Sequence, residues 1–336
     1  AALAALCAIW AAAQAAPAPL CTGYSGLPPG FGAPGGSRAG MVDISAGRFR
    51  MGSSDGYPEE REVHEVRVAG FWMDRHEVTN AQFALFVQAT GYVTRAERKP
   101  QAQDFARLDA DRLQPGSAVF VPPRGAEHPG GGAYAWWRWV PGASWRHPQG
   151  PGSGIAGLQN HPVVHVAYED ALAYARWLGH ELPTEAQWEY AARGGLDGAE
   201  YPWGNTPDAK GRPMANTWQG RFPSTDSGRD GHKGTAPVGC YPANGFGLYD
   251  VVGNVWEWTR DPYQARHPAA PMVDPVVVSL PAAGTGGAAP AKVIKGGSFL
   301  CAPDFCVRYR PAARQPQDTL LGAVHIGFRT VLNQAP

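Results

Sequence analysis

The sequence Lys295-Gly296-Gly297-Ser298-Phe299-Leu300-Cys301-Ala302-Pro303-Asp304-Phe305-Cys306 places two of the chain's five cysteines close together behind a Gly-Gly-Ser turn. Arg308, Tyr309 and Arg310 follow directly. The glycines allow the backbone to turn sharply or to lie close to a neighbouring segment. Two thiols held on such a loop form a disulfide, bind a soft metal ion or act as a nucleophile with a resolving partner. We expect the remaining chain to form a scaffold for this loop.

The composition favours a folded protein rich in ordered loops. The chain has 336 residues, of which 44% are hydrophobic, so one large domain or two small ones are expected. Only 17% of residues are charged and the formal net charge is zero, which gives no electrostatic signal for nucleic acid or for an anionic membrane surface. The 43 Gly and 32 Pro residues interrupt regular elements, and the 12 Trp residues are expected to hold the loops together.

The first forty residues differ from the rest. Residues 1–16 are apolar and end in Ala13-Gln14-Ala15, a small-x-small pattern typical of the end of a secretory signal peptide. An Ala/Pro-rich leader is the alternative, and the apolar run is too short for a membrane span. Residues 17–40 predict a flexible lead-in, and residues 41–334 predict one domain. A signal peptide implies the lumen of the endoplasmic reticulum, or a bacterial periplasmic or secreted protein.

The cysteines do not predict a disulfide framework for a chain of this length. They are Cys7, Cys21, Cys240, Cys301 and Cys306, and we expect Cys240, to which we assign no role, to be buried. In a secreted protein a structural disulfide is the first interpretation of the last two cysteines. Such a bond would close a short loop and constrain the unfolded chain little. A pair of thiolates suits monovalent copper, and the spacing suits a redox dithiol equally well.

The hydrophobic pattern predicts few regular elements. Strands are expected at 63–68 running toward 71–73, at 161–166 and at 326–331. Helices are expected from the Thr79 cap to about residue 89, over 168–178, and from the Thr184 and Gln187 capping box to Gly194. Residues 264–291 predict a surface excursion. The long segment 95–160 carries a group of tryptophans that we expect to line a groove: Trp136, Trp137, Trp139 and Trp145.

Two further segments are rich in oxygen donors. Asn216 and Asp230 flank a polar loop, and Asp250 and Glu257 bracket Gly253-Asn254. Bent chains with carboxylate, amide and carbonyl oxygens are typical calcium ligands, although neither segment follows the helix-loop-helix pattern. Turn residues and helix caps are the alternative interpretation. We expect the histidines to be packed or exposed, and no zinc protease, Ser-His-Asp or phosphate-loop motif is present in the sequence.

Together these segments give a recognisable pattern. The chain resembles the formylglycine-generating enzymes, which are sulfatase-modifying oxidases. The Gly-Asn-x-Trp-Glu-Trp motif marks only the wider superfamily, whereas the Cys-x4-Cys loop after Gly-Gly-Ser indicates the oxidase. The matching blocks lie between about residues 41 and 331: Met51-Gly52-Ser53, Glu77-Val78-Thr79-Asn80, Trp145-Arg146-His147-Pro148, Leu182-Pro183-Thr184-Glu185-Ala186, Tyr201-Pro202-Trp203-Gly204-Asn205, Gly253-Asn254-Val255-Trp256-Glu257-Trp258 and Gly327-Phe328-Arg329.

The resemblance implies a single α+β domain, low in regular secondary structure and related to the C-type lectin fold. It implies that Cys301 and Cys306 hold Cu(I), with the cysteine of an unfolded or nascent sulfatase segment Cys-x-Pro-x-Arg as third ligand. Oxygen would be reduced at the copper in the presence of a thiol reductant. A hydrogen would leave the substrate Cβ, and the sulfur would be lost to give the aldehyde formylglycine. The enzyme would act as a monomer.

The resemblance also implies roles for further residues. Ser298 matches a serine near the active cysteines, and Trp256 matches a tryptophan beneath the site. We assign substrate binding to Trp256, Arg308 and Trp145. Two structural calcium sites are implied, in which Thr217, His232, Gly253 and Val255 would offer backbone oxygens. Their complete sets are Asn216, Thr217, Asp230 and His232, and Asp250, Gly253, Val255 and Glu257.

The chain departs from the family pattern in places. Ala302-Pro303 replaces a His-Arg pair, Phe305 replaces Tyr, and His325 stands where Asn is frequent, which affects peptide affinity more than metal chemistry. The cysteines of two further animal disulfides are missing, at positions that include Ala175, Ala192, Pro311 and Thr330. The main alternative is a non-catalytic binding module of the superfamily, with the two loop cysteines as a disulfide. A histidine-derivative sulfoxide synthase would need a histidine triad for iron, which the sequence does not show.

Overall fold

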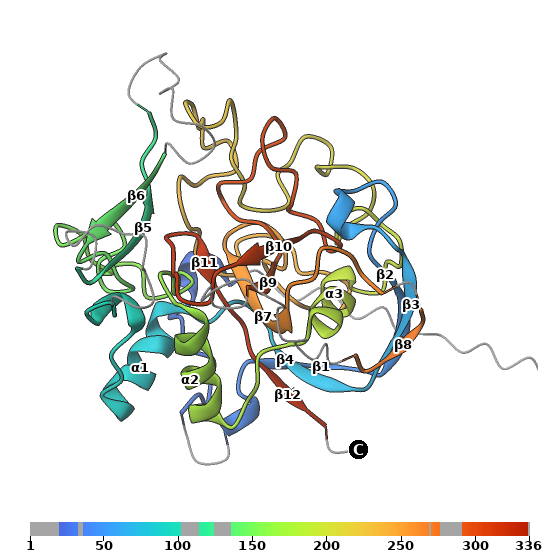
Figure 1. The fold of residues 1–336 in the computed structure, drawn as a ribbon, viewed down its shortest axis with the longest axis horizontal. Coiled ribbons are helices and arrows are strands. Elements are labelled where there is room, and N and C mark those ends of the chain that lie inside the picture. Colours follow the sequence, from blue (N-terminus) through green and yellow to red (C-terminus); the bar gives the residue numbers. More distant parts are fainter. Residues whose placement is uncertain are drawn as a thin grey trace, which may run out of the picture.

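The computed structural model describes residues 20–32, 36–101, 114–123, 136–268, 270–275 and 291–334. Short strands and long loops make up most of these ranges, with α1 (Asn80–Thr90) and α2 (Tyr168–Leu178) at one edge and α3 (Glu185–Arg193) between the strands (Figure 1). The fold class expected from the sequence, a single α+β domain with little regular secondary structure, is confirmed. The proposed signal peptide and residues 276–290 of the expected surface excursion lie outside the described residues.

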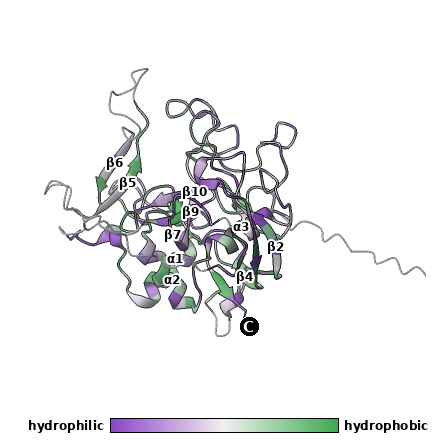
Figure 2. Ribbon diagram, turned by 45° about the vertical axis from the view of Figure 1, so that its right-hand side comes forward, coloured by the Kyte–Doolittle hydropathy of each residue, from purple (hydrophilic) through white to green (hydrophobic). Residues whose placement is uncertain are grey.

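The helices lie where the caps in the sequence place them. The hydroxyl oxygens of Thr79 and Thr184 accept hydrogen bonds from the third residue of α1 and α3, which satisfies backbone N–H groups that the helix leaves free. Each helix ends at a left-handed glycine. Helices α1 and α2 carry both hydrophobic and hydrophilic stretches, as elements with one buried face should (Figure 2).

The largest sheet carries the cysteine loop. Its strands are β7 (Trp256–Pro262), β9 (Lys292–Lys295), β10 (Arg314–Gln317) and β11 (Ile326–Gly327), in the order β10-β9-β7-β11. The β7-β9 and β9-β10 pairs are antiparallel, and β11 runs parallel to β7. The cysteine loop connects β9 to β10, so both of its ends are fixed by neighbouring strands.

Three smaller sheets surround it. One contains β1 (Met41–Ile44), β4 (Phe71–Asp74) and β12 (Val331–Asn333), in the order β1-β4-β12. Another contains β2 (Gly47–Met51), β3 (His64–Val68) and β8 (Met272–Val273), in the order β2-β3-β8. The hairpin of β5 (Gly116–Phe120) and β6 (Trp137–Pro141) extends at the upper left of Figure 1. Short 3-10 helices cover Cys21–Gly23, Gly36–Arg38, Pro58–Glu60 and Arg95–Glu97.

Three groups of buried apolar side chains form the core. The first joins α1 and α2 to the large sheet, the second lies between α3 and the two smaller three-stranded sheets, and the third lies beside the cysteine loop. Both loop cysteines belong to the first group. The thiol pair is therefore part of the core. Within the described residues, no helix is long and apolar enough to cross a membrane.

Two predicted strands differ from the structure. Residues 161–166 are irregular, with one isolated bridge between Pro162 and Thr79. Their backbone groups bond to two separate segments, since Val163 N donates to Val78 O and His165 N donates to Ala323 O. The closing strand is divided into β11 and β12, because the backbone N–H of Thr330 turns to the Asp74 carboxylate at 2.8 Å. The strand predicted at 161–166 is therefore absent, and the strand predicted at 326–331 is interrupted.

The described part of the expected lead-in contacts the domain at several points. Cys21 forms a disulfide with Cys240, across 219 residues of sequence. The Thr79 hydroxyl donates to Gly26 O at 2.6 Å, and the Asn160 amide donates to Cys21 O at 3.0 Å. Cys240 had no assigned role and was expected to be buried; it is only partly buried, and its disulfide fastens Cys21 to the domain.

Part of the expected surface excursion is also packed. Strand β8 pairs with β3, and His267 is buried at 7% exposure. Strand β8 has only two residues, which is too short to give a periodic pattern from which it could be predicted. Most described residues of this segment are exposed, as expected for a surface excursion, and only His267 and Pro275 are buried.

Candidate active site

The Gly-Gly-Ser turn shapes the cysteine loop. Gly296 and Gly297 have φ angles of 94° and 73°. A Cβ on Gly297 would lie 2.9 Å from the carbonyl of Arg308 and from the N of Tyr309. This glycine therefore lets the two ends of the loop touch, as no larger residue could without displacement. Within the loop, Cys306 N donates to Ala302 O at 2.9 Å and closes a tight turn between the cysteines.

The loop brings the two thiols together in reduced form. The Sγ atoms of Cys301 and Cys306 lie 2.8 Å apart, and the residues are 2% and 8% exposed. The structural disulfide that the sequence left open is therefore not formed here. The hydrogen bond from Cys301, aided by Arg308, lowers the pKa of Cys306 to about 7. Burial and the neighbouring sulfur raise the pKa of Cys301. One thiolate beside one thiol is thus favoured near neutral pH.

Arg308 faces Cys306 and is held in place by a second segment. Its guanidinium lies 3.8 Å from the ring centroid of Tyr57 and forms a 2.6 Å ion pair with Glu59. The Tyr57 hydroxyl accepts a hydrogen bond from Val307 N at 3.1 Å. The Tyr57–Glu60 turn therefore supports the cysteine loop, a role that sequence reasoning missed because the turn carries no motif. Besides the hydrogen bond from Cys301, Arg308 lowers the pKa of the Cys306 thiol, and its assignment to substrate binding stays a prediction.

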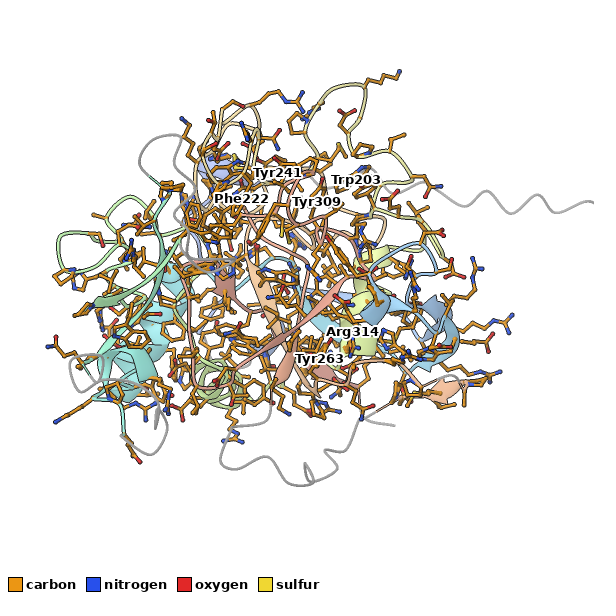
Figure 3. All side chains as sticks on the ribbon, turned by 45° about the horizontal axis from the view of Figure 1, so that its top comes forward. Trp203, Phe222, Tyr241, Tyr263, Tyr309 and Arg314 are labelled. Atoms are coloured by element: carbon orange, nitrogen blue, oxygen red, sulfur yellow. A yellow bond between two sulfur atoms is a disulfide. The ribbon has the colours of Figure 1, made fainter. Side chains whose placement is uncertain are left out.

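Aromatic side chains surround the tip of the loop. Phe305 stacks on Phe222 at 4.2 Å between centroids, and Trp136 meets both rings edge-on. Phe305 remains 47% exposed, so this platform is accessible beside Cys306. A cavity of about 630 Å³ borders the loop at Pro303 and Tyr309. Figure 3 shows the labelled Phe222 and Tyr309 in one region of the molecule. The platform and the cavity offer an apolar place for an extended peptide.

Two of the predicted tryptophans are buried. Trp145 is fully buried and meets Phe83 edge-on at 5.2 Å. It belongs to the core and not to an open groove wall, and its assignment to substrate binding stays a prediction. The sequence could not separate it from Trp136 because both occur in one irregular segment. Trp256 is 2% exposed in the same buried group as the two thiols, which suits a place beneath the site.

Ser298 lies at the base of the loop and is fully buried. Its hydroxyl oxygen accepts a hydrogen bond from Leu300 N at 3.2 Å, and its carbonyl accepts one from Cys301 N at 2.9 Å. These contacts fix the first cysteine. A catalytic role for Ser298 remains a proposal.

The residues of the first expected calcium site are neighbours in the structure. The Asp230 carboxylate accepts hydrogen bonds from Thr217 N at 3.0 Å and from His232 N at 3.2 Å. Asn216 is 2% exposed and donates to Gly234 O and to Asn254 Oδ1. The loop therefore concentrates oxygen donors around Asn216 and Asp230, as calcium requires.

The second set lies on the adjoining turn. A Cβ on Gly253 would lie 2.5 Å from Asn216 O, so the two loops touch. Burial raises the pKa of Asp250 to about 7. Both oxygens of Glu257 already accept hydrogen bonds from Arg329 at 2.7 Å, and Oε2 also accepts one from Trp188 Nε1. Glu257 is thus a less available ligand than the sequence suggested.

Glu77 is a further acid that sequence reasoning missed. It is fully buried, and neither carboxylate oxygen has a hydrogen-bond partner. Burial and then the neighbouring Asp250 raise its pKa. An unpartnered buried carboxyl group needs either a proton or a cation. Among the described residues, no three His, Cys, Asp or Glu side chains surround one point, so a cation here would depend on amide and backbone oxygens as well.

The fold and the reduced thiol pair define a domain of the sulfatase-modifying type. Residues 31–334 match the family described as the sulfatase-modifying factor enzyme 1-like domain, and the chain belongs to this family. It is 52% identical over 291 residues to the formylglycine-generating enzyme of Mycobacterium tuberculosis, covering 87% of this chain and 97% of that protein. The family resemblance predicted from the sequence is confirmed.

Other relatives show how far the similarity extends. The bovine protein described as inactive Cα-formylglycine-generating enzyme 2 is 45% identical over 234 residues, covering 68% of this chain and 73% of that protein. The solved structure of PvdO from Pseudomonas aeruginosa superposes with a TM-score of 0.60 at 26% identity, over 88% of this chain and 94% of that one. Proteins of similar identity to this chain therefore include one described as inactive.

Proposed function

We propose that this protein is a copper-dependent oxidase that converts the cysteine of a sulfatase Cys-x-Pro-x-Arg segment to Cα-formylglycine. The observation that carries this proposal is the reduced pair of Cys301 and Cys306, with sulfurs 2.8 Å apart beside an accessible aromatic platform. The extensive identity to a formylglycine-generating enzyme supports it. The sulfatase would be bound as an unfolded or nascent chain, because the loop cysteines lie below the surface.

The donor set fits monovalent copper. Two buried sulfurs, one of them favoured as the thiolate, are soft ligands that select Cu(I) over harder cations. Two protein ligands also leave a position for the thiolate of the substrate. When bound, copper would supply the one-electron chemistry that allows ground-state oxygen to react with a thiol.

The chain's own residues would bind and orient the reactants. Cys306 Sγ is held as a thiolate next to Arg308, while Cys301 Sγ keeps its proton and donates toward it. Trp256 closes the floor of the site, and Ser298 fixes the backbone of Cys301. Phe305 and its aromatic neighbours would hold the peptide and exclude water from the reacting sulfur.

The overall reaction balances with a thiol reductant. One substrate thiol, one molecule of oxygen and two molecules of the reductant give one aldehyde, one hydrogen sulfide, one disulfide of the reductant and one water. The C–S bond of the substrate and one C–H bond break, and a C=O bond forms. Oxygen accepts four electrons, two from the substrate carbon and two from the reductant.

We also propose two structural calcium ions. Asn216, Thr217, Asp230 and His232 would form one site, supported by their common loop and hydrogen bonds. Asp250, Gly253, Val255 and Glu257 would form the other. The unpartnered carboxylate of Glu77 supports a cation near Asp250, because this buried charge otherwise has no compensation.

The Cys21–Cys240 disulfide supports an oxidising compartment, either the lumen of the endoplasmic reticulum or the bacterial envelope and exterior. The same compartment would contain maturing sulfatases. A local thiol reductant or a bound metal would keep Cys301 and Cys306 as thiols there. We propose that the enzyme works as a monomer, with no nucleic-acid partner.

The test is mass spectrometry of a Cys-x-Pro-x-Arg peptide incubated with the protein, Cu(I), oxygen and a thiol reductant. We expect the peptide mass to change as the CH2SH side chain of its cysteine becomes an aldehyde. A peptide with Ser in place of Cys should keep its mass. A protein that binds copper through the pair but leaves the peptide unchanged would favour a different substrate motif. A protein whose loop thiols resist reduction and bind no copper would be the non-catalytic binding module.

A further inference from the structure

Two histidines and two methionines line a small cavity outside the thiol pair's own site. The cavity lies between the β2-β3-β8 sheet and the segment after β7, and its volume is about 20 Å³. This is about the space that one water molecule or one ion needs. The four side chains are Met51, His64, His267 and Met272.

His64 is prepared as a ligand. It is 5% exposed, and its Nδ1 lies 2.8 Å from Glu62 O. A carbonyl oxygen only accepts hydrogen bonds, so Nδ1 carries the proton and Nε2 carries a lone pair. Nε2 is buried and has no hydrogen-bond partner. Histidines that bind metals usually donate their other N–H to a carbonyl in this way, which fixes the ring.

His267 lies opposite. Its ring centroid is 5.5 Å from that of His64, and its own Nε2 is also buried without a partner. Buried polar atoms are normally paired, so two unpaired imidazole nitrogens at one cavity need a common explanation. A single atom that accepts both lone pairs would provide it.

The methionines add soft sulfur to the same cavity. Met51 is the direct cross-strand partner of His64 in the β2-β3 pair. Met272 pairs with Val66, the next residue of β3 whose side chain points to the buried face. The chain has only five methionines, and two of them line this cavity. Imidazole together with thioether suits copper, and the thioether favours its monovalent form.

The carboxylates nearby do not favour a hard cation. Glu185 lines the cavity, but Arg314 binds it through two hydrogen bonds of 2.7 and 2.9 Å. Asp261 also lines the cavity and accepts a hydrogen bond from Glu185 N at 2.7 Å. Calcium and magnesium need several oxygen ligands, whereas the unpaired donors here are nitrogen. The site therefore selects a soft metal with a low coordination number.

We propose that His64 and His267, together with the thioethers of Met51 and Met272, form a second Cu(I) site separate from the thiol pair. Copper there would connect the β2-β3-β8 sheet to the segment that contains His267. The β2 and β3 ligands stand on paired strands, which hold them in fixed register. This inference does not depend on oxidation of a peptide.

The experiment uses the full chain with both loop thiols replaced, Cys301→Ser/Cys306→Ser. Cu(I) is added without oxygen in competition with a chromogenic Cu(I) chelator, and the bound equivalents are counted. We expect one equivalent to remain bound and to raise the melting temperature, because the metal binds the folded state. X-ray absorption should show nitrogen and sulfur neighbours around the copper. No bound copper in this variant would mean that the cavity holds only water, and the proposal would fail.

Further variants locate the copper. Adding His64→Gln/His267→Gln should abolish the remaining equivalent, whereas Met51→Leu, which keeps the volume, should weaken affinity by roughly tenfold or more. His180→Gln is the matched control, because both of its ring nitrogens already bond to Thr330 Oγ1 and Ser37 O. Undiminished copper in the folded His64/His267 variant would overturn the assignment. Failure of the proposed oxidase would appear separately, as an unmodified peptide with the wild-type protein.

Discussion

Arg329 and Glu257 form a fully buried ion pair in which two guanidinium nitrogens donate to the two carboxylate oxygens, each at 2.7 Å. The pair joins the Gly-Phe-Arg segment to the Trp-Glu-Trp segment, and its two members lie 72 residues apart in the sequence. Arg329 also donates to the carbonyls of Asp74 and Tyr249. These contacts place the turns before β7 and after β11 around one charged centre.

Removing one member of this pair should destabilise the protein strongly. Glu257→Ala leaves the Arg329 guanidinium buried without its carboxylate, so the free energy of unfolding should fall by roughly 3–5 kcal/mol. Chemical denaturation in the presence of a calcium chelator measures this loss of unfolding free energy for the metal-free protein. Asp197→Ala is the control, because the Arg50–Asp197 pair is 63% and 46% exposed and should contribute about 0–1 kcal/mol. Equal losses in the two variants would contradict the role of the buried pair.

Calcium should change the pH dependence of stability. Burial raises the pKa of Asp250 to about 7, so the metal-free folded state keeps this carboxyl protonated. Its unfolded pKa is about 4, so the stability it contributes is greatest below pH 4 and is lost as pH rises through about 7. Bound calcium should reverse this trend, because it binds the ionised carboxylate. The gap in melting temperature between calcium and chelator samples should therefore widen from about pH 5 to about pH 8. A gap that stays constant or is zero would argue against calcium at this turn.

The Cys21–Cys240 disulfide should stabilise the fold without contributing to the chemistry. It links residues separated by 219 positions and fastens the first described segment to the loop before Asp250. Cys21→Ser/Cys240→Ser should lower the free energy of unfolding by roughly 2–4 kcal/mol. Peptide oxidation below the new melting temperature should persist. Loss of oxidation in a folded variant would mean that the disulfide positions the active site.

Gly297 should be required for the position of the cysteines. In Gly297→Ala the new Cβ would meet the backbone of Arg308 and Tyr309, so the loop has to move and peptide oxidation should fall by at least about tenfold. Gly211→Ala is the control, because its φ of 81° imposes the same backbone strain with no atom within 4 Å of the added Cβ. Similar melting temperatures with very different activities would support the close contact as the cause. Full activity in Gly297→Ala would refute it.

Local signals in the sequence predicted the helices and the cysteine loop. The Thr79 and Thr184 caps and the glycines that follow α1 and α3 are short-range features, and all lie where they were expected. The segment 161–166 was wrongly predicted as a strand, because its alternation of apolar residues serves contacts with two different segments. Patterns within a segment do not contain that information.

The site was predicted only where motifs exist. The thiol pair follows from Gly-Gly-Ser and the cysteine spacing, but its support by Tyr57 and Glu59 comes from a turn about 250 residues earlier. Trp145 and Trp136 belong to one irregular segment, yet one is in the core and the other lies beside Phe305. The unpaired nitrogens of His64 and His267 become visible only when the fold brings β3 next to residues after β7. Such long-range contacts have no signature in one sequence.

The most direct test of the central claim is mass spectrometry of the Cys-x-Pro-x-Arg peptide with wild type, Cys301→Ala and Cys306→Ala, each with Cu(I), a thiol reductant and with or without oxygen. We expect conversion of the thiol to the aldehyde by wild type in oxygen alone, and a large loss of conversion in both variants. Conversion by either variant at the wild-type rate, or conversion without oxygen, would contradict the assignment of the thiol pair as the oxidase centre.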